Sequence, residues 1–148
     1  MLVVRSYQPA DRPQLRRLLA FLPEFYPGAT DWLEWRLDKL ENHEFGSCVV
    51  VSCGQELVAV LIETPTGPRE LRLHTFYVDE RFRGQGIGTG LLACAQRHWP
   101  RRTYITVSDE RDEELRPILE QQGFIPEACQ PNAYRPGHDE FVFARYDG

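Results

Sequence analysis

The sequence predicts an α/β fold with one mixed, mostly antiparallel sheet and helices on both of its faces. Runs typical of buried strands alternate along the chain with runs whose leucines recur at helical spacing. Residues 70–107 form a strand, helix and strand pattern, and such a crossover joins two parallel strands with a right-handed turn. Hairpin-like pairs elsewhere make the other strand pairs antiparallel. Residues 1–148 can bury one sizeable core, so we expect a single domain.

The first part of the chain predicts one strand and two helices. Alternating residues 2–7 form the strand, and leucines then recur at helical spacing behind Asp11 and Pro13. Residues 23–28 break this first helix. The second helix begins near Asp31, whose carboxylate we expect to cap it.

The middle of the chain predicts three strands and a helix. Residues 45–52 and 56–64 are rich in β-branched side chains and are separated by Cys-Gly, which is typical of a hairpin. A turn at 65–68, with two prolines and a glycine, precedes a third strand at 70–78. Apolar residues at helical spacing then predict a helix over 86–98.

The last part of the chain predicts strands on either side of an acidic helix. Residues 102–107 form a strand, and the helix begins near Asp109 and ends at Gly123. Residues 124–125 and 140–146 are the last strand candidates. The proline-rich connection between them carries no pattern that predicts a structure.

Composition and charge exclude several classes of partner. The chain has 22 acidic and 17 basic residues and a formal net charge of −5, so its field repels nucleic acid. Its longest apolar run, 57–62, is far shorter than the roughly 20 residues that span a membrane. The N-terminus lacks the charged and apolar regions of a signal peptide. We therefore expect a cytoplasmic protein with no nucleic-acid or membrane partner.

The cysteines do not predict a metal site. Cys48, Cys53, Cys94 and Cys129 lack paired metal-binding spacing and are expected to be core thiols. Cys94 and His98 stand one helical turn apart and could share a metal, but further ligands at recognisable spacing are missing. We expect no bound metal.

The most informative segment of the chain, Arg83–Gly88, lies where the strand 70–78 turns into the helix 86–98. Glycine occupies every second position from 84 to 90, which leaves backbone N–H groups free to converge on one point. The first-turn amides of a helix lie at the positive end of its dipole, so phosphate oxygens are their natural ligand. The segment therefore predicts a phosphate-binding turn.

Two known phosphate-binding patterns fit this turn poorly. A Walker-type loop needs a lysine after its last glycine, and the only lysine in the chain is Lys39. A dinucleotide fingerprint could be spelled by 88–93, with Asp109 at about the distance of the ribose-binding acid. Its first glycine should directly follow the strand, however, and residues 79–83 intervene. A dinucleotide-binding enzyme is kept as the weaker alternative.

The run 73–92 resembles the acetyl-coenzyme A motif of the GNAT superfamily of N-acetyltransferases. That motif is written Arg/Gln-x-x-Gly-x-Gly/Ala, and here it comprises Arg83, Gly86 and Gly88. The resemblance implies a GNAT-type sheet whose central parallel strand pair is splayed for coenzyme A. It also implies acetyl-coenzyme A (acetyl-CoA) as cosubstrate, with its diphosphate on the glycine turn and its pantetheine arm along the strand that ends at Val78. The binding residues implied in this way are Phe76, Tyr77, Val78, Arg83, Gly84, Gln85, Gly86, Ile87, Gly88 and Thr89.

The resemblance further implies direct transfer of an acetyl group to a primary amine within a ternary complex. In the family, a main-chain N–H at the Val78 position faces the thioester oxygen and stabilises the negative charge that develops there. The attacking amine must be neutral, so a base is needed, and His74 stands where family members often carry an acid. Glu63 and Glu70 are weaker candidates for the base.

The sequence departs from the family pattern at the group that protonates the leaving thiolate. Leu119 stands where many members have a tyrosine for this purpose, and Asp112 stands near the place of a family asparagine. Ser108 or Tyr134 could replace the missing acid. We expect His74 and Ser108 to be catalytic, and we keep a noncatalytic acyl-coenzyme A binding module as the second hypothesis.

The resemblance places the acceptor between the first two helices and the last hairpin. The aromatic side chains of this region lie beside acidic residues, an arrangement that would suit a cationic amine. We therefore expect a small-molecule amine or a peptide amine as partner, and a homodimer stays open. The residues concerned are Phe25, Tyr26, Trp32, Trp35 and 134–141, with the acids Asp31, Glu34, Asp139 and Glu140.

Overall fold

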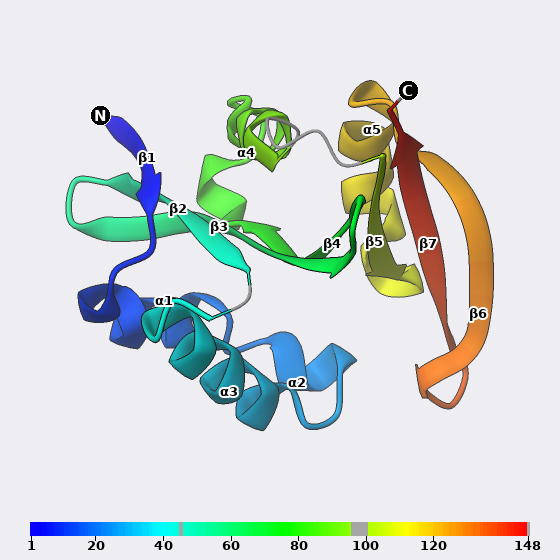
Figure 1. Ribbon diagram of the computed structural model, residues 1–148, viewed down its shortest axis with the longest axis horizontal. Helices are drawn as coiled ribbons and strands as arrows, with labels where there is room; N and C mark the ends of the chain where they lie inside the picture. Colours follow the sequence, from blue (N-terminus) through cyan, green and yellow to red (C-terminus); the bar gives the residue numbers. More distant parts are fainter. Residues whose placement is uncertain (45, 96–100, 148) are drawn as a thin grey trace.

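A single twisted sheet forms the centre of the molecule (Figure 1). The computed structural model describes residues 1–44, 46–95 and 101–147. In these residues seven strands pair in the order β1-β2-β3-β4-β5-β7-β6, and every neighbouring pair except β4–β5 is antiparallel. The predicted mixed sheet is therefore confirmed. The strands are β1 Leu2–Ser6, β2 Ser47–Cys53, β3 Glu56–Gly67, β4 Glu70–Val78, β5 Arg102–Ser108, β6 Ile125–Arg135 and β7 His138–Tyr146.

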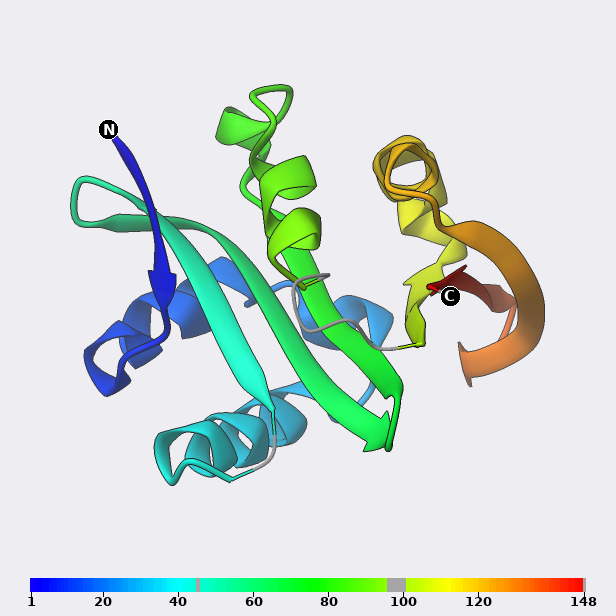
Figure 2. The ribbon, with the colours of Figure 1, turned by 45° about the horizontal axis from the view of Figure 1, so that its top comes forward.

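Helices cover both faces of the sheet, as predicted. One face packs against α1 (Arg12–Leu18), α2 (Leu22–Phe25) and α3 (Ala29–Glu41). On the other face, α4 (Ile87–Ala95) lies on β3 and β4, whereas α5 (Asp112–Gln121) lies on β5 (Figure 2). None of the helices in the described residues is both long and apolar enough to span a membrane.

Each face of the sheet buries its own apolar cluster, because side chains on successive strand residues point to opposite faces. The cluster under α1–α3 contains five fully buried side chains, those of Leu15, Leu37, Val50, Val60 and Ile62. The cluster under α4 and α5 is larger and includes side chains from β3, β4, β5 and β7. Its largest fully buried members are Leu61, Leu73, Phe76, Leu91, Leu92, Leu119, Phe124 and Phe143.

The parallel pair β4–β5 is bonded along only part of its length. The ladder joins residues 70–73 to residues 102–105, while β4 continues to Val78 and β5 to Ser108. The strands separate beyond this point, which is the splay that the family resemblance implies. A bulge in β4 lies at the same level, because Ile62 pairs with Thr75 and Glu63 pairs with Leu73, so that His74 is an extra residue.

Two local expectations were wrong. The helix α3 begins at Ala29 behind Gly28, which has a φ of +82°, and Asp31 lies inside its first turn without capping it. Residues 22–25 form a short helix instead of a break. The proline-rich segment after Gly123, for which the sequence predicts no structure, forms the long edge strand β6, which pairs with β7. Prolines are tolerated in β6 because an edge strand needs only one of its two rows of hydrogen bonds.

Candidate active site

A cleft on the α4–α5 face contains most of the glycine-rich segment. It has a volume of about 550 Å³ and lies between the end of β4, the start of α4 and one side of α5. The gap between β4 and β5 therefore opens into a cleft with the backbone of the glycine-rich turn on one side and α5 on the other. The residues that line it are Phe76, Val78, Phe82, Arg83, Gly84, Gly86, Ile87, Gly88, Thr89, Glu114, Leu115, Ile118 and Gln121.

The glycines of this cleft meet two different requirements. Gly84 and Gly86 have φ values of +79° and +81°, which residues with a Cβ rarely adopt. Gly88 is needed for space, since a Cβ there would lie 3.1 Å from the ring of Phe76. The turn delivers the chain into α4, whose first intrahelical bond at this end runs from Gly90 N to Gly86 O. The amides of residues 87–89 therefore lie ahead of that bond, at the positive end of the helix.

The exposed edge of β4 faces the gap between β4 and β5. Asp79 N donates to Val58 O on β3, so alternation turns the N–H and C=O groups of Phe76 and Val78 toward the gap. Two arginines bind these carbonyls: Arg83 Nε donates to Val78 O at 3.0 Å, and Arg111 Nη2 donates to Phe76 O at 3.0 Å. The Val78 N–H thus faces the gap, which is the orientation that an oxyanion donor requires.

Arg83 also spans the cleft to α5. Its Nη2 lies 2.8 Å from a carboxylate oxygen of Glu114. Arg111 lies deeper, is buried, and stacks its guanidinium on the rings of Phe21 and Tyr77. Arg111 was not predicted as a site residue, because neither its charge nor its place in a helix cap marks it in the sequence as a residue of the gap.

Two of the predicted cofactor-binding residues lie away from the cleft. The side chain of Tyr77 points to the opposite face of the sheet and packs on Phe21, with ring centroids 4.5 Å apart. Gln85 is exposed at the tip of the turn and does not line the cleft. The other eight predicted residues do line it.

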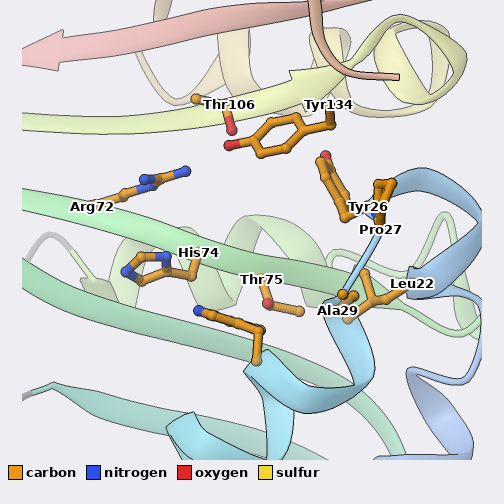
Figure 3. Close-up of a pocket in the computed structure, with 11 residues that line it drawn as sticks. Leu22, Tyr26, Pro27, Ala29, Arg72, His74, Thr75, Thr106 and Tyr134 are labelled. Atoms are coloured by element: carbon orange, nitrogen blue, oxygen red, sulfur yellow. The ribbon is translucent and has the colours of Figure 1, made fainter. Parts of the chain in front are cut away.

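A second hollow lies on the opposite face of the sheet, against α2 and α3 (Figure 3). Its volume is about 270 Å³. The β4 bulge lets two neighbouring residues, His74 and Thr75, line this hollow together. The two hollows therefore approach each other from opposite faces across the end of β4. The second hollow is lined by Leu22, Tyr26, Pro27, Gly28, Ala29, Trp32, Arg72, His74, Thr75, Thr106 and Tyr134.

His74 lies in this hollow, but in surroundings that disfavour its protonated form. Burial, and then the positive charges of Arg72 and Arg36, lower the pKa of His74 from 6.5 to about 3. Its Nε2 is hydrogen-bonded to the hydroxyl of Thr64, and its ring stacks on Trp32 with centroids 5.6 Å apart. The imidazole is therefore neutral and a weak proton acceptor, whereas the role predicted for it as a base requires a pKa near neutrality.

A buried carboxylate lies behind the wall of the same hollow. Glu140, on β7, is only 3 % exposed and accepts a hydrogen bond from Tyr26 Oη at 2.8 Å and another from the hydroxyl of Thr106. Burial raises the pKa of Glu140, and burial followed by the charge of Glu140 raises the pKa of Tyr26. Tyr26 and Thr106 line the hollow, so they connect it to Glu140. Glu140 was expected only as one of several acids near the acceptor.

The other acid–base candidates occupy different places. Ser108 caps the turn that follows β5, where its hydroxyl accepts from Glu110 N at 3.3 Å, and it lines neither hollow. Glu70 pairs with Arg102 at the far end of β4, and Glu63 is buried and accepts from the hydroxyl of Ser47. Tyr134 does line the acceptor-side hollow, where it stacks edge-on against Tyr26.

Several of the aromatic and acidic residues expected beside the acceptor lie outside this hollow. Trp35 and Phe25 do not line the hollow, and neither do Asp31 and Asp139. Glu34 is engaged with Arg16 on the outside of α3. The hollow is thus walled by aromatic rings, as expected, but its charged wall residue is an arginine.

Of the possible metal pair Cys94 and His98, His98 lies outside the described residues. Among the described residues, one group of three side chains that could bind a metal lies close together, namely Asp109, Glu110 and His138. Glu110 is ion-paired with Arg135, and Asp109 accepts from the Asp139 amide at 3.0 Å. These contacts account for the cluster as an anchor of the β6–β7 hairpin.

Comparisons with known proteins agree on the fold. Residues 13–124 match the acetyltransferase (GNAT) family. Among solved structures, a Desulfovibrio desulfuricans protein assigned to the GNAT family superposes with a TM-score of 0.81 at 20% identity, covering 99% of both chains. Ard1 from Thermoplasma volcanium gives 0.76 at 25% identity, covering 98% of this chain and 97% of its own. The ribosomal-protein-S18-alanine N-acetyltransferase from Escherichia coli gives 0.79 at 16% identity, covering 99% and 94%. No curated protein sequence gives a significant match to this chain.

Proposed function

This chain belongs to the GNAT acetyltransferase family, and from that premise we propose that it transfers the acetyl group of acetyl-CoA to a primary amine. The observation that carries this proposal is the pair of hollows on opposite faces of the sheet, which are lined by successive residues of β4, Thr75 and Phe76, beyond the point where β4 and β5 part. We call the cleft beside α4 the donor cleft and the hollow beside α3 the acceptor hollow. A donor and an amine bound in them would reach each other through the gap.

The donor cleft has groups suited to a diphosphate and to an amide-containing arm. The first-turn amides of α4 would bind the diphosphate, and the glycines leave room for it. The N–H groups of Phe76 and Val78, whose carbonyls are held by Arg111 and Arg83, would donate to the arm along this strand edge. When bound, acetyl-CoA supplies an activated acyl group on a thioester.

The proton of the attacking amine needs an acceptor in the acceptor hollow. We assign this role to Glu140, acting through Tyr26: the amine proton passes to Tyr26 Oη while Tyr26 passes its own proton to Glu140. A carboxylate with a raised pKa is a stronger base than an imidazole whose pKa is about 3. His74 would then act as a positioning residue for the hollow.

The leaving thiolate of the coenzyme does not require a side chain to protonate it. The amine nitrogen bonds to the acyl carbon, the carbon–sulfur bond breaks, and the thiolate leaves. A thiol pKa of about 8.5 makes thiolate a fair leaving group without assistance. This is consistent with Leu119, a fully buried core residue, at the position of the family tyrosine.

A ligand comparison followed by a turnover assay tests the proposal. We expect acetyl-CoA, and not nicotinamide dinucleotide, to raise the unfolding temperature, because a ligand that binds only the folded state stabilises it. We also expect free thiol to form when amines are added. Stabilisation by acetyl-CoA without thiol release across a broad amine panel would favour the noncatalytic binding module. Stabilisation by the dinucleotide alone would favour the dinucleotide-binding enzyme.

The proton acceptor is tested by Glu140→Gln, which keeps a hydrogen-bond acceptor for Tyr26 but removes the charge. We expect kcat to fall about 100-fold or more, with unchanged stabilisation by acetyl-CoA. Glu24→Gln, the same change at an exposed position of α2, is the control and should leave kcat unchanged. Equal kcat for Glu140→Gln and the wild type, with a large loss for His74→Asn, would return the role to His74.

A further inference from the structure

Arg72 places a positive charge in the wall of the acceptor hollow. It lies on β4, opposite Thr64 of β3 and Tyr104 of β5, and lines the hollow together with His74. Its Nε is buried and has no hydrogen-bond partner among the residues that the structure describes. Its guanidinium carbon lies 5.9 Å from the centroid of the Tyr104 ring. A buried donor without a partner favours a ligand that supplies an acceptor.

Other arginines of this face are already engaged by the protein. Arg102 pairs with Glu70 and Glu127, and Arg135 pairs with Glu110. In the described residues, Arg72 is in no ion pair of this kind. Its charge does act on Glu140 across the hollow, but that carboxylate already accepts hydrogen bonds from Tyr26 and Thr106.

Two hydroxyl groups lie with Arg72 at the same end of the hollow. Figure 3 shows the polar ends of Arg72, Thr106 and Tyr134 turned toward one another. The same three residues line a neighbouring hollow over β5 and β6, so they form the wall that the two hollows share. A guanidinium can give a carboxylate bidentate hydrogen bonds, and the Tyr134 hydroxyl can donate a further one, whereas the single hydroxyl proton of Thr106 is already donated to Glu140.

The same charges oppose a purely cationic acceptor. Arg72 and Arg36 both lower the pKa of His74, which shows that the field in the hollow is positive at that point. A polyamine would carry its second ammonium into this field. An amine whose second charge is negative would not be repelled.

We propose that the acceptor is an amine that also carries a carboxylate, which Arg72 binds with the help of Tyr134. The inference rests on the proposed function and names the substrate class of that reaction. The volume of about 270 Å³ is below the roughly 300–1,000 Å³ of sites for drug-sized ligands, so the part inside the hollow has about the size of one amino acid. The carboxylate is that of a free amino acid or that of an acidic side chain at a peptide N-terminus.

The test compares matched amines under identical conditions by release of the coenzyme thiol. One arm uses each standard amino acid beside its carboxamide. The second arm uses short peptide amides that begin with Asp or Glu beside those that begin with Asn or Gln. We expect the carboxylate-bearing member of at least one arm to be preferred about 30-fold or more in kcat/KM, and the arm that responds identifies the source of the carboxylate.

Variants of Arg72 then test whether this residue carries the preference. Arg72→Gln should remove most of the preference while leaving stabilisation by acetyl-CoA unchanged, and Arg72→Lys should restore part of it as a point charge without the bidentate geometry. Arg17→Gln, on the exposed side of α1, removes the same charge far from the hollow and should retain the preference. An unfolding scan of each variant confirms that it is folded.

Each result separates the inference from the proposed function. Equal rates for the carboxylate and the amide member of each pair, in both arms, would overturn the inference and leave the acetyltransferase standing. A preference for carboxylates that survives Arg72→Gln would overturn the role of Arg72. Stabilisation by acetyl-CoA with no thiol release in either arm would overturn the proposed function, and the inference with it.

Discussion

The donor cleft and the acceptor hollow lie on opposite faces of the same strand, yet they are built in different ways. Residues 76–89 supply most of the donor cleft in one continuous segment, and one side of α5 completes it. The acceptor hollow takes side chains from α2, α3, β4, β5 and β6, which are far apart in sequence. The first presents mainly backbone amides and glycines, whereas the second presents rings, hydroxyls and one guanidinium.

This difference follows from what each ligand requires. A diphosphate and an amide-containing arm are recognised by backbone groups, and those depend on chain conformation more than on side-chain identity. An acceptor is recognised by side-chain charge and shape, which can change while the fold stays the same. The donor cleft therefore defines the reaction class, and the acceptor hollow defines the substrate.

The largest expected effect is the loss of donor binding on placing a negative charge in the first turn of α4. Thr89→Glu puts a carboxylate among the amides that would bind the diphosphate, and like charges in contact repel by several kcal/mol. We expect the affinity for acetyl-CoA, measured by titration calorimetry, to fall about 100-fold or more. The fold should persist, because an acidic residue near a helix N-terminus is favourable.

Thr89→Gln is the matched control, with the same side-chain length and no charge. It should weaken binding by less than about 10-fold, since it adds bulk but no repulsion. If both variants bind acetyl-CoA with the affinity of the wild type, the diphosphate does not lie at the start of α4. The proposal that backbone amides of α4 recognise the donor would then be wrong.

The same contrast explains what could be predicted from the sequence. Spacing alone located the strand that ends at Val78, the turn with its glycines and the helix after it, because backbone conformation leaves a local pattern. Arg72 and Glu140 left no such pattern, since their roles depend on a bulge in β4 and on the pairing of β7 with β5. The strand β6 was missed for a related reason: its prolines disfavour a strand locally, while pairing with β7 stabilises one.

His74 gives the acceptor hollow a sensitivity to acid that can be measured as stability. Its pKa is 6.5 in the unfolded chain and about 3 in the folded protein, so the unfolded state binds the proton first. Stability due to this residue is therefore fully present above pH 6.5 and is lost as the pH falls from 6.5 toward 3. After allowance for partial exposure, we expect a loss of about 1–3 kcal/mol over this window.

Urea unfolding of the wild type and of His74→Asn at neutral and acidic pH isolates this contribution. All other titrating groups are shared, so the difference between the two proteins should shrink or reverse as the pH falls. Parallel stability curves over the window would show that His74 titrates normally. It would then regain the near-neutral pKa needed of a direct base.

The smallest expected effect returns to the donor cleft, where Glu114 binds the side chain of Arg83 across the opening. Glu114→Gln removes a negative charge beside the place proposed for the diphosphate and releases Arg83 toward it. Because partly exposed ion pairs are worth at most about 1 kcal/mol, we expect the affinity for acetyl-CoA to rise only about 2- to 4-fold. Glu113→Gln makes the same change on the exposed side of α5, outside the cleft, and should leave the affinity unchanged. An equal rise in both variants would mean that net charge, and not the bridge to Arg83, controls entry of the donor. A fall in Glu114→Gln alone would mean that Glu114 itself helps to bind acetyl-CoA.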